Sequence, residues 1–384
     1  MKIGIITFQL AWNCGAVLQC YAMQEFIKSK GHDVVVINYR PDYKKYRYVK
    51  YCNPFLTAKR EIEGTKGFKE AVKRYINKFG RTILNFRSSS EHIRQYNGFQ
   101  SFCQERLNLT REYSSVEQLM QYPPKCDIYI SGSDQLWNPK LTNNELDPAY
   151  FLQFGAKTTK RITYAVSACE FNVAKDGESL RVLCAPLDHI SLREHEGKEI
   201  IEELSGKKIE ICPDPTFLPN RDVFDVLQPK NIVGKQDYIL VYLLSDATDD
   251  TSAFDIVKKI KEITDKEVFV ISGPRHWPYE VTQIQGVLPE EFVYYIKNAS
   301  FVVCNSFHAS VFSILYEKQF VTLSFKNRNS RMLELLNNLD LTNRMLRNIN
   351  DLDELVKDTI DYNEIGKKVQ VQHEIGAEYL ERCL

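Results

Sequence analysis

The sequence of 384 residues has no excess of either charge, because its 50 basic residues balance its 50 acidic ones. A neutral chain has no overall field that would attract nucleic acid or a strongly acidic partner. No apolar run approaches the roughly 18 residues that a membrane-spanning helix needs, and no internal repeat is present. These absences exclude strongly basic, membrane-spanning and repeat proteins, and we expect a globular cytoplasmic protein.

The ten cysteines show no pairing pattern. They are scattered singly, without a C-x-x-C motif and without a histidine at metal-ligand spacing. Most stand in apolar runs such as F-V-V-C. Buried, reduced thiols of a cytosolic chain explain this distribution best, so we expect no metal site.

What the sequence does contain is an alternation of apolar strands and helices. Residues 2–8 predict a buried strand, residues 15–30 a helix that ends at Gly31, and H-D-V-V-V-I-N-Y the next strand. This βαβ start implies a parallel sheet. A second alternating series begins at D-Y-I-L-V-Y-L-L, with helices expected near residues 251–264 and 289–298.

A domain boundary is expected near residues 213–222, where P-D-P-T-F-L combines two prolines with a loss of periodicity. The chain is long enough to bury two cores of ordinary size. We therefore expect two α/β domains with mostly parallel sheets, over residues 1–220 and 221–366. A polar helix over residues 367–384 can cross back onto the first domain.

A basic, aromatic insert interrupts the first domain at about residues 41–110. From Pro41 to Arg94 it carries fourteen lysines and arginines against five acidic residues, with tyrosines and phenylalanines between them. Such a patch suits an anionic membrane surface or a diphosphate-linked lipid. The alternative is a solvated pair of helices. Single-stranded nucleic acid matches less well, because nothing else in the chain resembles a nucleic-acid module.

Polar residues follow several predicted strands at their carboxyl ends. In open α/β sheets these ends hold the ligand, because the loops there lead into helix N-termini whose free N–H groups favour anions. Four such positions are Asn13 with Gly15, Ser131 to Asp134, Ser191 with Arg193, and Ser306 with His308.

His308 stands at the junction of the strand F-V-V-C and the helix that follows it. One interpretation is a histidine packed in the core beneath that helix. The other is a proton donor, because the positive end of a helix disfavours imidazolium unless an anion binds beside it. A bound dianion would favour the protonated ring and make it an acid near neutral pH.

Three basic residues are candidates for holding an anion. Arg193, at the carboxyl end of a strand, can bind a carboxylate or phosphate with two N–H groups, or form a surface ion pair with Glu194. Lys326 and Arg331 both lie in the run F-K-N-R-N-S-R, which follows the predicted strand at 319–325. That run is either a solvated loop or an anion clamp near the His308 helix.

The phrase S-G-S-D-Q-L-W-N-P combines a glycine, hydroxyls that include Ser133, a carboxylate and a tryptophan. Asp134 can orient or deprotonate a hydroxyl, and Trp137 can stack on a sugar ring. The alternative is a capped turn, with Asp134 as the N-cap and Trp137 in the core.

Taken together, several phrases resemble the polysaccharide pyruvyl transferase family over nearly the whole chain. Their order and spacing carry the likeness, since no single phrase is decisive. The chain reads S-F-H-A-S where the family commonly has S-F-H-G-T, so Ala309 replaces a glycine beside the histidine. The phrases are N-C-G-A-V-L-Q-C-Y-A-M-Q, S-G-S-D-Q-L-W-N-P, I-T-Y-A-V-S-A, I-S-L-R-E, P-D-P-T-F-L, I-K-N-A-S-F-V-V-C-N-S-F-H-A-S-V-F-S and S-R-M-L-E-L-L.

The resemblance implies a GT-B-like pair of Rossmann-like domains with a cleft between them. It implies transfer of the enolpyruvyl group of phosphoenolpyruvate onto two hydroxyls of a sugar, forming a cyclic pyruvate ketal in cell-surface polysaccharide synthesis. The second domain would bind the donor and the first the acceptor. The family's histidine falls on His308, its arginine on Arg193, and a later basic residue on Lys326 or Arg331.

The chemistry of the donor suggests the roles of these residues. His308 would protonate the methylene carbon, while Arg193, Lys326 and the backbone from Ser306 hold the carboxylate and phosphate. The acceptor would be bound by Asn13, Gly15, Asp134, Ser133 and Trp137. The route needs no metal and no cofactor, and the acceptor can be linked to a lipid diphosphate. The alternatives are a GT-B glycosyltransferase that uses a nucleotide sugar, or a non-catalytic sugar-binding subunit of a capsule assembly complex.

Overall fold

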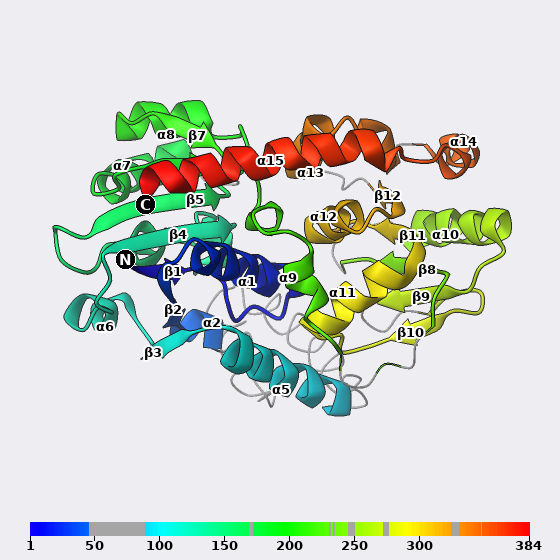
Figure 1. Ribbon diagram of the computed structural model, residues 1–384, viewed down its shortest axis with the longest axis horizontal. Coiled ribbons are helices and arrows are strands. Elements are labelled where there is room, and N and C mark those ends of the chain that lie inside the picture. The colour runs from blue at the N-terminus through cyan, green and yellow to red at the C-terminus, as the bar shows by residue number, and fades with distance from the viewer. Residues whose placement is uncertain are drawn as a thin grey trace, which may run out of the picture.

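The computed structural model of the chain describes residues 1–45, 89–168, 172–229, 232, 235–244, 250–271, 276–323, 330–346 and 348–384. These residues form two α/β domains that lie side by side, each built on one sheet with helices against it (Figure 1). Every strand pairing in both sheets is parallel, as the βαβ start of the sequence predicts.

The first domain contains a seven-stranded sheet of order β3-β2-β1-β4-β5-β6-β7. Ile3, Ile5 and Ile6 of the central strand β1 are fully buried, because helices cover both faces of a parallel sheet. The strands are β1 (Lys2–Ile6), β2 (Asp33–Tyr39), β3 (Leu109–Tyr113), β4 (Ile128–Asp134), β5 (Lys160–Val166), β6 (Ile190–Leu192) and β7 (Ile209–Ile211).

The first helix shows how local sequence sets the element boundaries. Helix α1 (Cys14–Ser29) begins after Asn13, whose side chain accepts hydrogen bonds from the backbone N–H groups of Gly15 and Ala16. It ends before Gly31, which has a φ of 83°. The other helical segments of this domain are α2 (Asp42–Lys45), α5 (Ser89–Arg106), α6 (Val116–Gln121), η2 (Pro139–Leu141), η3 (Pro148–Phe151), α7 (Val173–Cys184), α8 (Lys198–Ser205) and η4 (Pro215–Phe217).

The second domain contains a six-stranded sheet of order β10-β9-β8-β11-β12-β13. Its strands are β8 (Tyr238–Tyr242), β9 (Val268–Ile271), β10 (Thr282–Ile284), β11 (Ala299–Cys304), β12 (Gln319–Leu323) and β13 (Met345–Leu346). Its helical segments are α9 (Asp222–Asp225), α10 (Asp250–Thr264), α11 (Pro289–Asn298), α12 (Phe307–Leu315), α13 (Ser330–Asn338), η5 (Thr342–Arg344), η6 (Ile349–Asp351) and α14 (Leu352–Lys357).

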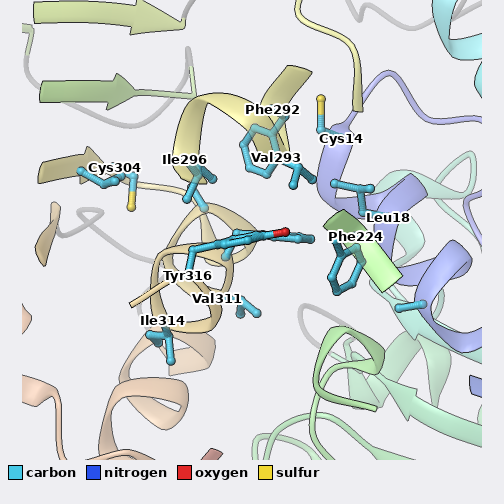
Figure 2. Packing of buried hydrophobic residues seen from close by; sticks show 14 of the residues in the cluster. Cys14, Leu18, Phe224, Phe292, Val293, Ile296, Cys304, Val311, Ile314 and Tyr316 are labelled. Carbon is cyan, nitrogen blue, oxygen red and sulfur yellow. The ribbon is translucent and has the colours of Figure 1, made fainter. Parts of the chain in front are cut away.

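Helix α1 belongs to the first domain but packs into the second. Its residues Cys14 and Leu18 lie against Phe224, Phe292 and Val293, within one buried cluster that we call the shared core (Figure 2). The cluster continues through α11 and α12 to the sheet of the second domain. Burial of this apolar surface stabilises the arrangement of the two domains.

Two further helices connect the domains. In α5, Arg94 donates a hydrogen bond from Nη1 to the carbonyl of Gly286 at 2.8 Å and pairs with Glu291 of α11. Helix α15 (Tyr362–Cys383) begins beside β12, where Tyr362 donates to the carbonyl of Lys318, and runs across both domains (Figure 1). At its far end Tyr379 donates to the carbonyl of Thr163 of β5 at 2.9 Å.

Helix α15 therefore begins before the expected residue 367 and contacts the first domain, as a returning helix would. The predicted insert is described only at its two ends, and residues 46–88 lie outside the described residues. In the part of the chain that the structure describes, no helix has both the length and the apolar character to cross a membrane.

Candidate active site

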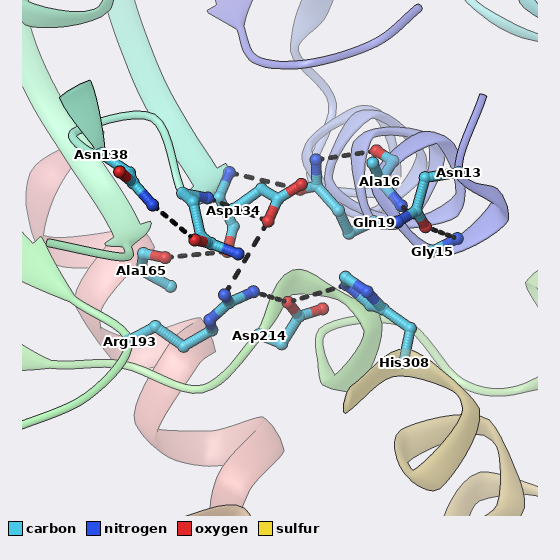
Figure 3. Close-up of polar contacts among 12 residues, drawn as sticks. Asn13, Gly15, Ala16, Gln19, Asp134, Asn138, Ala165, Arg193, Asp214 and His308 are labelled. Carbon is cyan, nitrogen blue, oxygen red and sulfur yellow. Dashed lines mark hydrogen bonds and ion pairs between the residues drawn. The ribbon is translucent and has the colours of Figure 1, made fainter. Parts of the chain in front are cut away.

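The polar residues that the sequence singled out do gather where carboxyl ends of strands from both sheets meet (Figure 3). Asn13 begins α1 after β1, Asp134 ends β4, and Arg193 follows β6. From the second domain, His308 enters the same region after β11. A fifth residue, Asp214, follows β7 and lies between Arg193 and His308.

His308 is the second residue of α12, whose N-cap is Ser306. The Ser306 hydroxyl accepts a hydrogen bond from the Ala309 N–H at 3.4 Å, so this side chain caps the start of the helix. The imidazole is largely buried, with 9 % of its side chain exposed, and Nε2 lies 3.4 Å from Asp214 Oδ2.

The opposite side of the imidazole lies against Gly15 of α1. A methyl group on Gly15 would be only 2.2 Å from His308 Cγ, so no larger residue fits there without movement of the ring. Both helices present their first turns to this region, and the unpaired N–H groups of a first turn attract anions. The site therefore combines a histidine with two converging positive helix ends.

Asp214 is the residue of this candidate site that sequence reasoning missed. Its Oδ2 accepts a hydrogen bond from Arg193 Nη1 at 2.9 Å, and its Oδ1 accepts from the N–H and hydroxyl of Thr216 at 3.1 and 2.8 Å. Burial alone would raise the pKa of Asp214, but His308, Arg193 and the Thr216 N–H together hold it well below its ordinary value. The carboxyl group is therefore a buried anion next to His308.

Arg193 is buried, with 3 % of its side chain exposed, so the alternative of a surface ion pair is wrong. Besides Asp214, its guanidinium lies 3.6 Å from Glu194 and 3.9 Å from Asp134, and it stacks over the Phe307 ring at 4.6 Å. Burial lowers the pKa of Arg193, but the three carboxylates outweigh that effect and raise it. Its Nε and Nη2 atoms lack a hydrogen-bond partner among the described residues.

Glu194 differs from Asp214 although both lie beside the same guanidinium. Burial raises the pKa of Glu194, and the opposing effects of Arg193, Arg331 and Ser167 do not reverse that shift. Its Oε1 accepts a hydrogen bond from the Ala168 N–H at 3.1 Å. One carboxylate in this group is thus stabilised as an anion and the other is not.

Arg331, at the start of α13, reaches the first domain. In the orientation of the Gln135 side-chain amide that gives both its oxygen and its nitrogen hydrogen-bond partners, the oxygen accepts hydrogen bonds from Arg331 Nη1 and Nη2 at 3.1 and 3.0 Å. Arg331 also lies close enough to Glu194 to favour its charged form. The predicted donor-binding residue Arg331 is thus at the interface of the domains, whereas Lys326 lies outside the described residues.

Two predicted acceptor residues are structural instead. Trp137 is fully buried, stacks on Phe151 with ring centroids 4.5 Å apart and donates to the Tyr150 carbonyl at 3.3 Å. Ser133 is also fully buried and donates from its hydroxyl to the Ala165 carbonyl at 2.8 Å. The prediction that they contact a sugar is wrong, because neither side chain reaches the surface.

The other three acceptor candidates, Asn13, Gly15 and Asp134, are at the site but have local partners. The side-chain oxygen of Asn13 caps α1, and Gly15 contacts His308. Asp134 has 16 % of its side chain exposed. The alternative that Asp134 is an N-cap is wrong for a helix, because no helix begins there, and its carboxylate accepts a hydrogen bond from the N–H of Gln135 at 2.9 Å. Among the described residues, no group of three or more His, Cys, Asp or Glu side chains is arranged to hold a metal ion.

Comparison with solved structures supports the fold. UDP-GlcNAc 2-epimerase from Methanocaldococcus jannaschii shares 12 % identity, with 94 % of this chain and 93 % of that chain covered and a TM-score of 0.50. The S. aureus MnaA–UDP co-structure shares 10 % identity, with 96 % and 90 % covered and a TM-score of 0.50. At these identities the likeness shows a common two-domain fold and nothing about substrates.

Comparison with protein families is more specific. No curated protein matches the chain significantly. The family model described as polysaccharide pyruvyl transferase matches residues 13–327, a span that includes Asn13, Asp134, Arg193, Asp214 and His308. The chain therefore belongs to the polysaccharide pyruvyl transferase family, and it is a pyruvyl-transferring enzyme with two Rossmann-like domains of the GT-B type.

Proposed function

We propose that the chain transfers the enolpyruvyl group of phosphoenolpyruvate onto two hydroxyls of one sugar, forming a cyclic pyruvate ketal. The observation that carries the proposal is the position of His308, where the first turns of α1 and α12 meet at the carboxyl edges of both sheets. A proton donor between two positive helix ends suits a substrate that is both an anion and an enol ether.

The reaction begins when protonated His308 gives its proton to the methylene carbon of the donor, which becomes a methyl group. The neighbouring carbon becomes electrophilic, and one sugar hydroxyl adds to it while its proton returns to His308. The bond from that carbon to the phosphate oxygen then breaks. The second hydroxyl adds in its place, its proton leaves with inorganic phosphate, and the ketal closes.

Several groups are available to hold the donor. The positive first turns of α1 and α12 suit the phosphate and carboxylate oxygens by their charge. The N–H groups of Gly15, Ala16 and Ala309 are already bound by the cap residues Asn13 and Ser306. Arg193 remains a candidate, because two of its nitrogens lack partners among the described residues. Arg331 contributes a further positive charge at the same interface, and Lys326 stays a candidate from the sequence.

The acceptor side is assigned to the first domain. Asp134, partly exposed and 3.9 Å from Arg193, would orient a sugar hydroxyl by accepting a hydrogen bond from it. Asn13 lies beside the same space at the start of α1. A lipid-diphosphate-linked acceptor agrees with the basic insert, which would hold the enzyme at the inner face of the membrane.

Release of inorganic phosphate tests the reaction. The purified chain is incubated with phosphoenolpyruvate and a panel of lipid-linked and nucleotide-linked sugars, and the products are identified by mass spectrometry. We expect phosphate release that depends on a sugar and a product enlarged by one pyruvate ketal. His308→Ala should lose about 10²-fold or more of the rate. His32→Ala is the control, because His32 precedes β2 at the opposite edge of the sheet.

The competing donor is a nucleotide sugar. Thermal unfolding is measured with phosphoenolpyruvate and with UDP-sugars, because a ligand that binds the folded state raises the midpoint. Stabilisation by the UDP-sugar alone would contradict the proposal. If His308→Ala releases phosphate at the unchanged rate, His308 has no part in the chemistry.

The membrane contact has a separate test. Co-sedimentation is measured with vesicles of neutral lipid and with vesicles that also contain anionic lipid. We expect binding to the anionic vesicles that weakens as salt is raised, since salt screens surface charge. Equal binding to both kinds of vesicle would count against a role of the basic insert.

A further inference from the structure

We propose that Asp214 is a positioning residue for His308: it holds the proton of the neutral imidazole on Nε2, so that Nδ1 is the nitrogen that delivers a proton. The proposal rests on the proposed function of His308 as the acid. It adds a residue from the first domain to the proton donor of the second, so the acid is complete only when the two domains are together.

The carboxylate of Asp214 is held in place on every side. Arg193 donates to Oδ2 at 2.9 Å, and Thr216 donates to Oδ1 through its N–H and its hydroxyl. Pro213 and Pro215 restrict the backbone on both sides of it. The carboxylate is fully buried, so water does not compete with His308 for Oδ2.

The two nitrogens of the His308 ring face different surroundings. Nε2 lies 3.4 Å from Asp214 Oδ2, and no described group is within hydrogen-bonding geometry of it. Nδ1 faces Gly15, since a methyl group on that residue would be 2.3 Å from it. A carboxylate prefers an N–H opposite it, whereas the positive start of α1 disfavours one. Both effects favour the Nε2–H tautomer of the neutral ring.

The charged groups around His308 also favour transfer through Nδ1. Asp214 is the charged group that faces the ring directly, Arg193 lies behind it, and Glu194 and Asp134 lie around Arg193. From α1 the ring meets Gly15, and from its own helix it meets the perpendicular ring of Phe307, both uncharged. After Nδ1 loses its proton, the remaining Nε2–H still lies beside the Asp214 carboxylate, 3.4 Å from Oδ2, and this negative charge stabilises the product of the transfer.

Nitrogen NMR of histidine-labelled protein tests the tautomer without any substrate. The His308 signals are assigned by their loss in His308→Asn, and spectra are recorded at a pH where the ring is neutral. We expect the Nε2–H form in the wild type. In Asp214→Asn the amide can donate to Nε2, and the Nδ1–H form should become dominant. An Nδ1–H form in the wild type, or the same tautomer in both proteins, would overturn the proposal.

Kinetics with a matched control complete the test. The control is Asp225→Asn. Like Asp214, Asp225 pairs with a cation and a hydroxyl, those of Lys297 and Tyr316, each at 2.8 Å. It lies beside the opposite end of α12, away from His308. We expect Asp214→Asn to lower kcat about 10²-fold while the KM for phosphoenolpyruvate stays within about 3-fold, and Asp225→Asn to leave both unchanged. Thermal unfolding of both variants shows that they are folded.

The two proposals fail separately. If the tautomer changes as expected but the wild type does not use phosphoenolpyruvate, the positioning by Asp214 stands and the proposed donor is wrong. If the wild type releases phosphate and Asp214→Asn retains both its kcat and its tautomer, the reaction stands and the positioning role is wrong.

Discussion

The backbone of Gly15 lies directly against the imidazole of His308, although the two residues belong to different domains. A methyl group on Gly15 would be 2.2 Å from Cγ and 2.3 Å from Nδ1 of the ring. Since Gly15 is in a helix, its conformation is open to other residues, and the restriction comes from the contact alone. The glycine of N-C-G-A-V-L is thus explained by the residue that it faces.

Substitution Gly15→Ala should therefore displace His308. We expect kcat to fall about 10²-fold, because misplacement of a catalytic group by about 1 Å has effects of that size, with a smaller change in the unfolding midpoint. Steady-state kinetics and thermal unfolding check this. Gly366→Ala in α15 is the control, since no described atom outside the adjacent backbone of α15 lies within 4 Å of the added methyl group, and it should stabilise the protein slightly. Full activity in Gly15→Ala would show that the ring moves freely.

Trp137 should matter for stability and not for the acceptor. Trp137→Phe removes ring atoms from a packed position beside Phe151 and the hydrogen bond to the Tyr150 carbonyl, so we expect a loss of about 1–3 kcal/mol in the free energy of unfolding. Urea unfolding measures the loss, and the KM for the sugar should not change. A large rise in that KM with unchanged stability would restore the sugar-stacking interpretation.

Asp214 should contribute to stability in a way that depends on pH. Its pKa in the folded protein is below the unfolded value of about 3.9, so its contribution is present above that value and is lost as pH falls through the folded pKa. The difference in unfolding free energy between wild type and Asp214→Asn should be largest above about pH 5 and shrink below about pH 4. Urea unfolding across this range is the measurement, and a constant difference would contradict the shift.

Glu194 should show the opposite dependence. Its pKa in the folded protein is above the unfolded value of about 4.3, so its favourable contribution is present below that value and is lost as pH rises through the folded pKa. Glu194→Gln cannot ionise and should therefore gain stability relative to wild type as pH rises. Thermal unfolding from pH 4 to pH 8 follows the two proteins, and a relative gain on acidification would refute the prediction.

The fold could be predicted from local sequence because cap residues and hydrophobic periodicity mark the ends of each strand and helix. Asn13 and Gly31 bracket α1, and the helices expected near 251–264 and 289–298 are α10 and α11. His308 could be found in the same way, because it stands between a buried strand and a helix start. These signals depend on neighbours in the chain.

The role of Asp214 could not be predicted, and the sequence could not decide between a packed and a sugar-stacking Trp137, because both roles depend on distant residues. The prolines around Asp214 indicate a turn, and the sequence alone does not show that β7 lies beside β6 and that α12 arrives from the other domain. Trp137 follows β4 in a segment without periodicity, so nothing local shows that it faces Phe151. Polar residues at the carboxyl ends of predicted strands identified the region of the site, and packing decided which side chains reach it.

The shared core constrains how substrates enter and leave. The first two turns of α1 are buried between the two domains. Separating the domains would expose these apolar side chains to water, at a cost of about 25 cal/mol for each Å² of apolar surface. A wide hinge opening is therefore disfavoured. Substrates and products are therefore expected to reach and leave His308 while the two sheets keep their mutual orientation.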